Sequence, residues 1–236
     1  CKSWNRWLAS IWKQGEGRLR WSCVLPLKTL DVAIEEMRFC RDNGACAVFL
    51  RCIEGDRLLH DPYFYPLYEA AAELGLAMAV HVGNGNEANC ELLTQHIAQG
   101  GGFWKFRMNT AGACHSLIAS DMMRQFPKLH FVFLEAGSQW LPFVISDLCR
   151  RLSHLRQPVD TILKENRIWV ACETCDDLPA VLTYAGDDSL VIGTDYGHAD
   201  QSSEIEAIYN LKKIGALPAA TLDKMIDDNP RALYGL

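Results

Sequence analysis

Four ionisable side chains follow apolar stretches of the sequence at the same relative place. His81 lies at the end of LAMAVHVG, Glu135 at the end of LHFVFLEAG, Glu173 at the end of RIWVACET and Asp195 at the end of SLVIGTD. A buried carboxylate or imidazole is costly unless it is paired or bound to a metal ion. One such group alone is equally well explained as a satisfied residue at a strand end, but four together favour a functional site.

Imidazole and carboxylate groups together suit a divalent metal such as zinc. A catalytic metal keeps one position open for water and lowers the pKa of that water towards about 7. Asp195 can then bind the metal, accept the proton of the water, or do both. His198 follows three residues later and can orient Asp195 or contact the substrate, and Asp200 adds a further carboxylate to this segment.

The apolar stretches predict a parallel sheet. They are continuous runs of Val, Ile, Leu and Phe, which is typical of strands buried on both faces. Six such strands are expected at residues 18–27, 45–52, 76–83, 129–137, 167–174 and 189–195. Helical patterns separate most of them, so the strands belong to βα units. Because the active site of a parallel barrel lies at the carboxyl ends of its strands, we expect the four ionisable side chains at one rim.

Composition narrows the class of protein. The chain has 236 residues, 49% of them hydrophobic and 22% charged, which fits a single globular domain over 1–236. The net charge is -6 and the basic residues are scattered, so we expect no nucleic-acid partner. No apolar run approaches the roughly 20 residues that cross a membrane, which leaves a small-molecule substrate as the expected partner.

The ten cysteines are interpreted as free thiols in a cytoplasmic protein. Several lie within predicted strands or helices, where cysteine behaves as a small hydrophobic residue. A chain of this length does not need disulfides for stability. Cys172 and Cys175 have redox or zinc spacing, but without a second such pair we interpret them as structural.

Other side chains are candidates for binding the substrate. Arg51 ends the stretch CAVFLR and can bind a substrate carboxylate through two parallel hydrogen bonds, although a salt bridge at the rim is the alternative. Trp140 can form a wall of the pocket or pack beneath the loop. Trp104, Lys105 and Arg107 can line the mouth of the site or a subunit interface.

The sequence resembles the amidohydrolase-related metal-dependent hydrolases of the TIM-barrel fold, in the branch that includes aminocarboxymuconate-semialdehyde decarboxylase. The matching segments occur in family order and are DPYFYPLYEAAAELGLAMAVHVG, FPKLHFVFLEAGSQWLPF, IGTDYGHAD and DNPRALYGL. The resemblance implies an α/β fold of the (β/α)8 type and an enzyme that needs a divalent metal. Zinc is the expected metal, and manganese is the alternative. Relatives are often dimers, so a homodimer is expected.

The resemblance also implies roles for individual residues. His81 resembles the metal-binding histidine at the end of the fifth barrel strand, and Asp195 the aspartate after the eighth strand, a metal ligand and proton shuttle. His198 matches the histidine of an Asp-Tyr-Pro-His signature, with Gly197 where proline is usual. Glu135 stands where the decarboxylases carry an acid–base histidine. It can transfer the same proton or accept hydrogen bonds from the neighbouring loop.

The largest departure from the family lies at the front of the sequence. The family places a metal-binding His-X-His pair at the end of its first strand, whereas no histidine here precedes His60. The first predicted strand, 18–27, corresponds to the third strand of the family. We therefore expect a barrel of the (β/α)8 type that lacks its first two strands, and a longer parent chain that supplies them.

Three functions follow as hypotheses. The first is a metal-dependent hydrolase of a small carboxylated or cyclic substrate, with Asp195 as the base. The second is non-oxidative decarboxylation of an aromatic or muconate-type acid, with Glu135 or Asp195 protonating carbon. The third belongs to another class and is motivated by the missing His-X-His pair. It is a non-catalytic barrel that has lost its metal and binds a ligand or a subunit.

Overall fold

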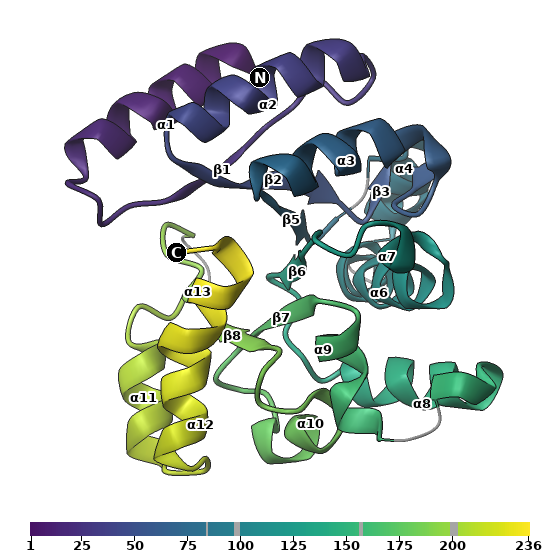
Figure 1. Cartoon of the computed structure of the whole chain (residues 1–236). Coiled ribbons are helices and arrows are strands. Elements are labelled where there is room, and N and C mark those ends of the chain that lie inside the picture. The colour runs from purple at the N-terminus through teal and green to yellow at the C-terminus, as the bar shows by residue number, and fades with distance from the viewer. Residues whose placement is uncertain (84, 97–99, 156–157, 199–202) are drawn as a thin grey trace.

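Six parallel strands form one open sheet in a computed structural model of the chain, which describes residues 1–83, 85–96, 100–155, 158–198 and 203–236. The strand order is β1-β2-β5-β6-β7-β8, so every strand pairs with its predicted neighbour (Figure 1). The strands are β1 (Trp21–Cys23), β2 (Ala45–Arg51), β5 (Ala77–His81), β6 (Phe131–Leu134), β7 (Ile168–Cys172) and β8 (Leu190–Ile192). The six strands and their parallel pairing are confirmed. Because β1 and β8 are the two edges of the sheet, the barrel is not closed.

The two faces of the sheet are packed by different groups of side chains. Met78 and Val80 of β5 belong to the large core that the helices cover, whereas the alternate residues Ala77 and Ala79 belong to a smaller cluster. Leu233 from the last helix joins that smaller cluster. The small side chains of β5 leave room on this inner face, which is the face that continues into the site described below.

Helices connect successive strands, and three more follow the last strand, β8 (Figure 1). They are α2 (Leu30–Asp42), α3 (Tyr65–Leu74), α6 (Asn109–Ala119), α7 (Met122–Gln125), α8 (Leu141–Arg151), α9 (Ile162–Glu165), α10 (Leu178–Ala185), α11 (Ala207–Ile214), α12 (Ala219–Asp223) and α13 (Asn229–Tyr234). Pro230 is in the first turn of α13, and a π-helical segment, Lys224–Asp228, links α12 to it. Proline starts a helix here because its fixed φ and missing N–H suit the first turn.

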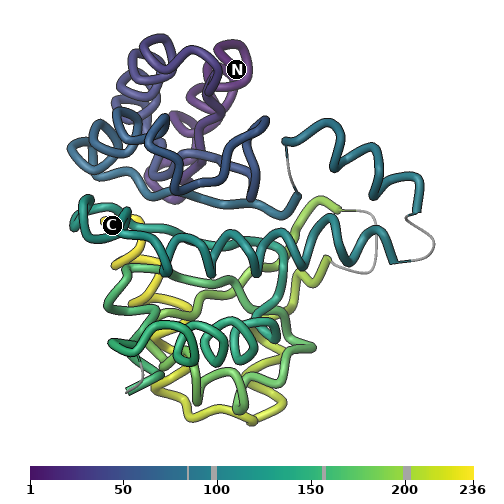
Figure 2. Tube along the Cα trace, turned by 90° about the vertical axis from the view of Figure 1, so that its right-hand side faces the viewer, coloured from purple at the N-terminus to yellow at the C-terminus, as the bar shows by residue number. Residues whose placement is uncertain are grey.

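The long insert after β5 forms a helical hairpin beside the sheet. It contains α4 (Glu87–Gln95), α5 (Gly101–Phe103), the π-helical segment Trp104–Met108 and α6. Figure 2 shows α4, together with the segment that begins at α5, extending to one side of the sheet. Helix α6 contributes six buried residues, whereas α4 buries none of its residues.

Several elements were not predicted, the short helix α9 among them. Helix α1 (Lys2–Gln14) packs beside α2, and a short hairpin of β3 (Ile53–Glu54) and β4 (Arg57–Leu58) follows β2. Only Asn5 and Ala9 of α1 are buried. Leu8 and Trp12 are partly buried and pack against the core, and the apolar residues of α1 do recur at helical spacing.

A buried carboxylate holds α1 in place. Glu36 of α2 is 2% exposed and accepts hydrogen bonds from Asn5 (3.0 Å) and from Nη1 of Arg6 (2.7 Å). The side chain of Asn5 also bonds the backbone N–H and carbonyl oxygen of Val24. Although burial raises the pKa of Glu36, the bonds from Arg6 and Asn5 outweigh burial and lower it below its ordinary value.

We predict that Glu36→Gln lowers the free energy of unfolding by about 1–2 kcal/mol at neutral pH, because it removes the charge that Arg6 and Asn5 bind. A carboxylate with a lowered folded-state pKa stabilises the fold above its unfolded pKa, about 4.3, and loses this contribution as the pH falls further. The difference between wild type and variant should therefore be constant from about pH 5 to 7 and shrink below about pH 4. Urea titrations across this range test it, with the exposed Glu16→Gln as control. A difference that grows in acid contradicts it.

All ten cysteines are free thiols, as predicted. Within the described residues, none of the helices combines the length and the apolar character that a membrane-spanning segment requires.

Candidate active site

A cavity of about 470 Å³ lies at the carboxyl ends of β5 to β8. His81, Glu135, Glu173 and Asp195 all line it, as the position of each at a strand end predicts. The remaining lining residues are Val82, Phe106, Arg107, Leu134, Ala171, Cys172, Gly193 and His198. The cavity thus combines an apolar lining with a few converging polar groups, which is typical of a small-molecule site.

The imidazole of His81 is oriented by the backbone. Its Nδ1 donates a hydrogen bond to the carbonyl oxygen of Val82 (3.1 Å), and its Nε2 contacts Oε2 of Glu135. A carbonyl oxygen can only accept, so Nδ1 carries a proton and the Nε2 of a neutral ring presents a lone pair to the carboxylate. Two electron-rich atoms in contact need a proton or a cation between them. Metal-binding histidines are commonly oriented in this way.

Glu135 and Asp195 both have unusual backbone conformations. The φ angle is 61° at Glu135 and 49° at Asp195, a region that residues with a side chain rarely adopt. Such a conformation costs of order 1–3 kcal/mol and persists where the surroundings enforce it, often at functional sites. Strained turns that follow β6 and β8 therefore place these two carboxylates.

The environment of Glu135 favours its protonated form. Burial raises the pKa of Glu135, and the neighbouring carboxylate of Asp195 adds to this effect. His81, His198 and Arg107 act in the opposite direction but do not cancel it. A carboxyl group with a raised pKa can serve as a proton donor nearer neutral pH.

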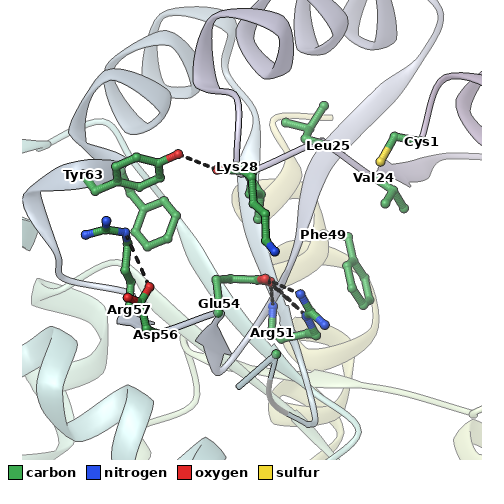
Figure 3. Close-up of a pocket in the computed structure, with 14 residues that line it drawn as sticks. Cys1, Val24, Leu25, Lys28, Phe49, Arg51, Glu54, Asp56, Arg57 and Tyr63 are labelled. Carbon is green, nitrogen blue, oxygen red and sulfur yellow. Dashed lines mark hydrogen bonds and ion pairs between the residues drawn. The ribbon is translucent and has the colours of Figure 1, made fainter. Parts of the chain in front are cut away.

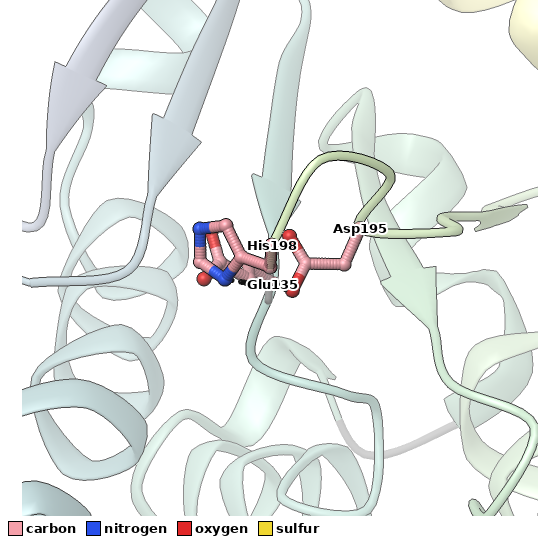
Figure 4. A group of neighbouring side chains, drawn as sticks. All are labelled: Glu135, Asp195 and His198. Atoms are coloured by element: carbon pink, nitrogen blue, oxygen red, sulfur yellow. Dashed lines mark ion pairs between the residues drawn. The ribbon is translucent and has the colours of Figure 1, made fainter. Parts of the chain in front are cut away.

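Three side chains converge closely enough to share an ion. One ligand atom from each of Glu135, Asp195 and His198 lies within 4.8 Å of the others. Figure 4 shows Asp195 pointing from its loop towards Glu135 and His198. Nδ1 of His198 lies 3.1 Å from Oδ2 of Asp195. Ligands of one metal ion at about 2.1 Å lie within roughly 4 Å of each other, so a small adjustment fits this oxygen and nitrogen set to a divalent metal.

Two predicted substrate-binding residues do not join this cavity. Arg51 lines a neighbouring cavity of about 890 Å³, where Nε and Nη2 bond Glu54 (Nη2 at 2.6 Å; Figure 3). The structure therefore favours the rim salt bridge for Arg51. Trp140 donates its indole N–H to the carbonyl oxygen of Gly137 (2.8 Å) and packs edge-on against Phe133, so it lies beneath the loop. Asp200 lies outside the described residues.

The loops after β6 and β7 are joined by one carboxylate that the sequence did not single out. Oδ2 of Asp176 accepts hydrogen bonds from the backbone N–H of Ser138 (2.8 Å), the hydroxyl of Ser138 (2.8 Å) and the backbone N–H of Glu173 (3.0 Å). Gly137 has a φ of 59°, and a Cβ there would lie 3.0 Å from Oδ1 of Asp176. The network fixes the ends of both strands beside the cavity.

We predict that Asp176→Ala lowers the free energy of unfolding by about 2–3 kcal/mol, because it leaves the buried donors of Ser138 without their acceptor. Chemical denaturation measures this change. The exposed Asp56→Ala is the control and should stay within about 0.5 kcal/mol of wild type. Equal stability of the two variants would contradict a structural role for Asp176.

Comparison with known proteins gives a family and a set of similar folds. The family model described as Amidohydrolase matches residues 1–236. No curated protein matched the sequence. Solved structures that resemble the chain include an amidohydrolase from Mycobacterium avium subsp. paratuberculosis K-10, with a TM-score of 0.68 and 24% identity. That comparison covers 91% of this chain and 57% of the other, so this chain spans little more than half of its length.

Two further structures are decarboxylases by description. 2,6-Dihydroxybenzoate decarboxylase from Rhizobium has a TM-score of 0.78 and 20% identity over 98% of this chain and 75% of its own. Dihydroxybenzoic acid decarboxylase from Polaromonas sp. JS666, with bound manganese and the inhibitor 2-nitroresorcinol, has a TM-score of 0.76 and 18% identity over 98% and 74%. These likenesses confirm a fold of the TIM-barrel type.

Proposed function

The chain belongs to the amidohydrolase family, and from this premise we propose that it is a metal-dependent hydrolase of a small carboxylated or cyclic substrate. One observation carries the proposal. His81, Glu135, Asp195 and His198, four groups able to bind a metal or move a proton, face one cavity at the carboxyl ends of the strands. The free thiols support a cytoplasmic location. The homodimer stays a prediction.

We propose His81 and Asp195 as ligands of a divalent metal, with Glu135 and His198 beside them. When bound, such a metal polarises a carbonyl group of the substrate and lowers the pKa of water. Zinc suits the mixed nitrogen and oxygen donors, and the manganese in the Polaromonas structure supports manganese as the alternative.

The residues of the chain divide the proton transfers between them. Asp195 accepts the proton of the attacking water, and His198, 3.1 Å from its Oδ2, orients the carboxylate. Glu135, whose pKa is raised by burial, donates a proton to the leaving oxygen or nitrogen. Val82 fixes the ring of His81 so that Nε2 faces the cavity. The bond from the carbonyl carbon to the leaving group breaks as that group takes up the proton.

Decarboxylation is the second candidate, and the raised pKa of Glu135 favours it. The bond between the substrate carbon and its carboxylate breaks, carbon dioxide leaves, and the electron pair stays on that carbon. Glu135 then supplies the proton that replaces the carboxylate. Two of the similar structures carry the names of decarboxylases of aromatic acids, which supports testing this reaction.

A panel of lactones and hydroxybenzoates separates these functions. The proposal predicts acid release from a lactone, measured in a pH-stat, without carbon dioxide. Release of carbon dioxide from a hydroxybenzoate, with no acid from any lactone, overturns hydrolysis in favour of decarboxylation. Neither product, together with no metal bound, supports the non-catalytic barrel.

A further inference from the structure

We infer that Arg107 binds the carboxylate of the substrate and that Glu173 holds the guanidinium group until the substrate arrives. This inference rests on the proposed function and names the residue that recognises the anionic group. Nη1 of Arg107 lies 2.9 Å from Oε1 of Glu173, and both side chains line the cavity of the candidate active site.

The charges of the cavity single out Arg107. Among the described residues that line the cavity, Arg107 is the only lysine or arginine, and it shares the cavity with the acidic residues Glu135, Glu173 and Asp195. The carboxylates of Glu173 and Asp195 repel an anionic ligand at short range in a partly buried site. A substrate carboxylate therefore gains most from the guanidinium, which matches carboxylate geometry with paired N–H groups.

The backbone around Arg107 is fixed. Arg107 belongs to the π-helical segment Trp104–Met108, a form that is frequent at functional sites. The hydroxyl of Thr110 donates to the carbonyl oxygen of Phe106 (2.8 Å), and the side chain of Asn109 donates to that of Lys105 (2.8 Å). Thr110 is fully buried. These bonds stabilise the helical segment that brings Phe106 and Arg107 to the cavity lining.

The guanidinium of Arg107 has capacity left for a ligand. It carries five N–H donors, of which one is bonded to Glu173 among the described residues. Its side chain is 38% exposed and that of Glu173 is 34% exposed, so this ion pair is accessible to a ligand. An exposed pair of this kind is weak and can exchange partners. Arg51 differs, because Glu54 bonds its Nε, its Nη2 and its backbone N–H.

The apolar lining indicates what the carboxylate is attached to. Phe106 precedes Arg107 at the mouth, and Leu134, Ala171 and Val82 line the wall. A compact apolar or cyclic body fits against these side chains, with its carboxylate turned to Arg107. Benzoate is the simplest probe with both features, and benzamide has nearly the same shape without the charge.

Calorimetric titration with benzoate and benzamide tests the inference, both on the protein as purified and after treatment with a chelator. We expect benzoate to bind in both states. Arg107→Met should weaken benzoate binding about tenfold or more, since it removes a charge-assisted hydrogen-bond pair. Arg107→Lys should restore part of the affinity, and Glu173→Gln should tighten benzoate binding several-fold because it removes the competing carboxylate.

Lys105→Met is the matched control, because Lys105 carries the same charge on the same π-helical segment but reaches Thr94 of α4 (3.4 Å). It should leave the affinity for benzoate unchanged, and benzamide binding should not distinguish any of the variants. The inference is overturned if wild type does not bind benzoate or if Arg107→Met stays within twofold of wild type. It is also overturned if Lys105→Met or Glu173→Gln weakens binding as much as Arg107→Met does.

The titration needs no turnover, so it separates this inference from the proposed function. Binding of benzoate that depends on Arg107, in a protein that releases neither acid nor carbon dioxide, overturns the proposed function alone. An active enzyme whose KM is the same in wild type and Arg107→Met overturns the assignment of Arg107 alone.

Discussion

Replacing Asp195 by asparagine is expected to lower kcat/KM by at least about 10³-fold while the fold is retained. Asparagine keeps the shape of the side chain but loses the charge that binds a divalent metal and accepts a proton. The backbone at Asp195, with a φ of 49°, suits asparagine, which tolerates this region better than most residues. We therefore expect the thermal midpoint of Asp195→Asn to stay within a few degrees of that of wild type.

Steady-state kinetics on the best substrate of the panel measure this effect, with circular dichroism to confirm folding. Asp121→Asn serves as control, because Asp121 is 70% exposed in its ion pair with Arg124 and lies outside the cavity. It should keep wild-type activity. If Asp195→Asn retains activity within about tenfold of wild type, Asp195 is neither the base nor an essential ligand.

Removal of the metal is expected to have an effect of similar size. Dialysis against a chelator should bring activity to the background rate, because Asp195 and His81 alone do not polarise a substrate carbonyl. Zinc or manganese should restore activity, whereas magnesium, which prefers an all-oxygen set, should restore little with His81 among the ligands. Full activity in protein shown to be metal-free would contradict a metal-dependent reaction.

The strands could be predicted because each is apolar on both faces. Val170 and Ala171 of β7, for example, belong to the two opposite clusters, so the whole segment is apolar regardless of the face. Helix α1 was not predicted, although its apolar residues recur at helical spacing; what the sequence does not show is where the helix packs. Trp4 and Trp7 are half-exposed, and the helix is held by a polar contact between Asn5 and Glu36. A buried hydrogen bond between distant residues leaves no periodic pattern.

The position of the candidate site could be predicted, whereas for Arg107 the sequence left two alternatives open, the mouth of the site and a subunit interface. His81, Glu135, Glu173 and Asp195 meet because parallel strands end at the same rim, which requires only their place after each strand. Arg107 lies in an insert, and no spacing rule says where an insert folds back.

Arg51 stands at a strand end, yet the following hairpin brings Glu54 onto its guanidinium. The Gly-Asp pair at residues 55 and 56 was the available signal for that turn. A two-residue turn there places Glu54 close to the end of β2, where its carboxylate accepts hydrogen bonds from the guanidinium of Arg51.

The strained conformations of Glu135 and Asp195 have no sequence signal either. Glutamate is not a residue that turns select, so its φ of 61° is enforced by the surrounding fold. Such local conflicts between residue and backbone are expected at functional sites.

The metal content of the purified protein tests most directly whether His81 and Asp195 hold one ion between them. Elemental analysis of wild type should give about one divalent metal per chain, and His81→Ala and Asp195→Asn should each contain far less after the same purification. Wild-type protein that takes up no metal from added zinc or manganese, or variants that retain the wild-type content, would contradict the account.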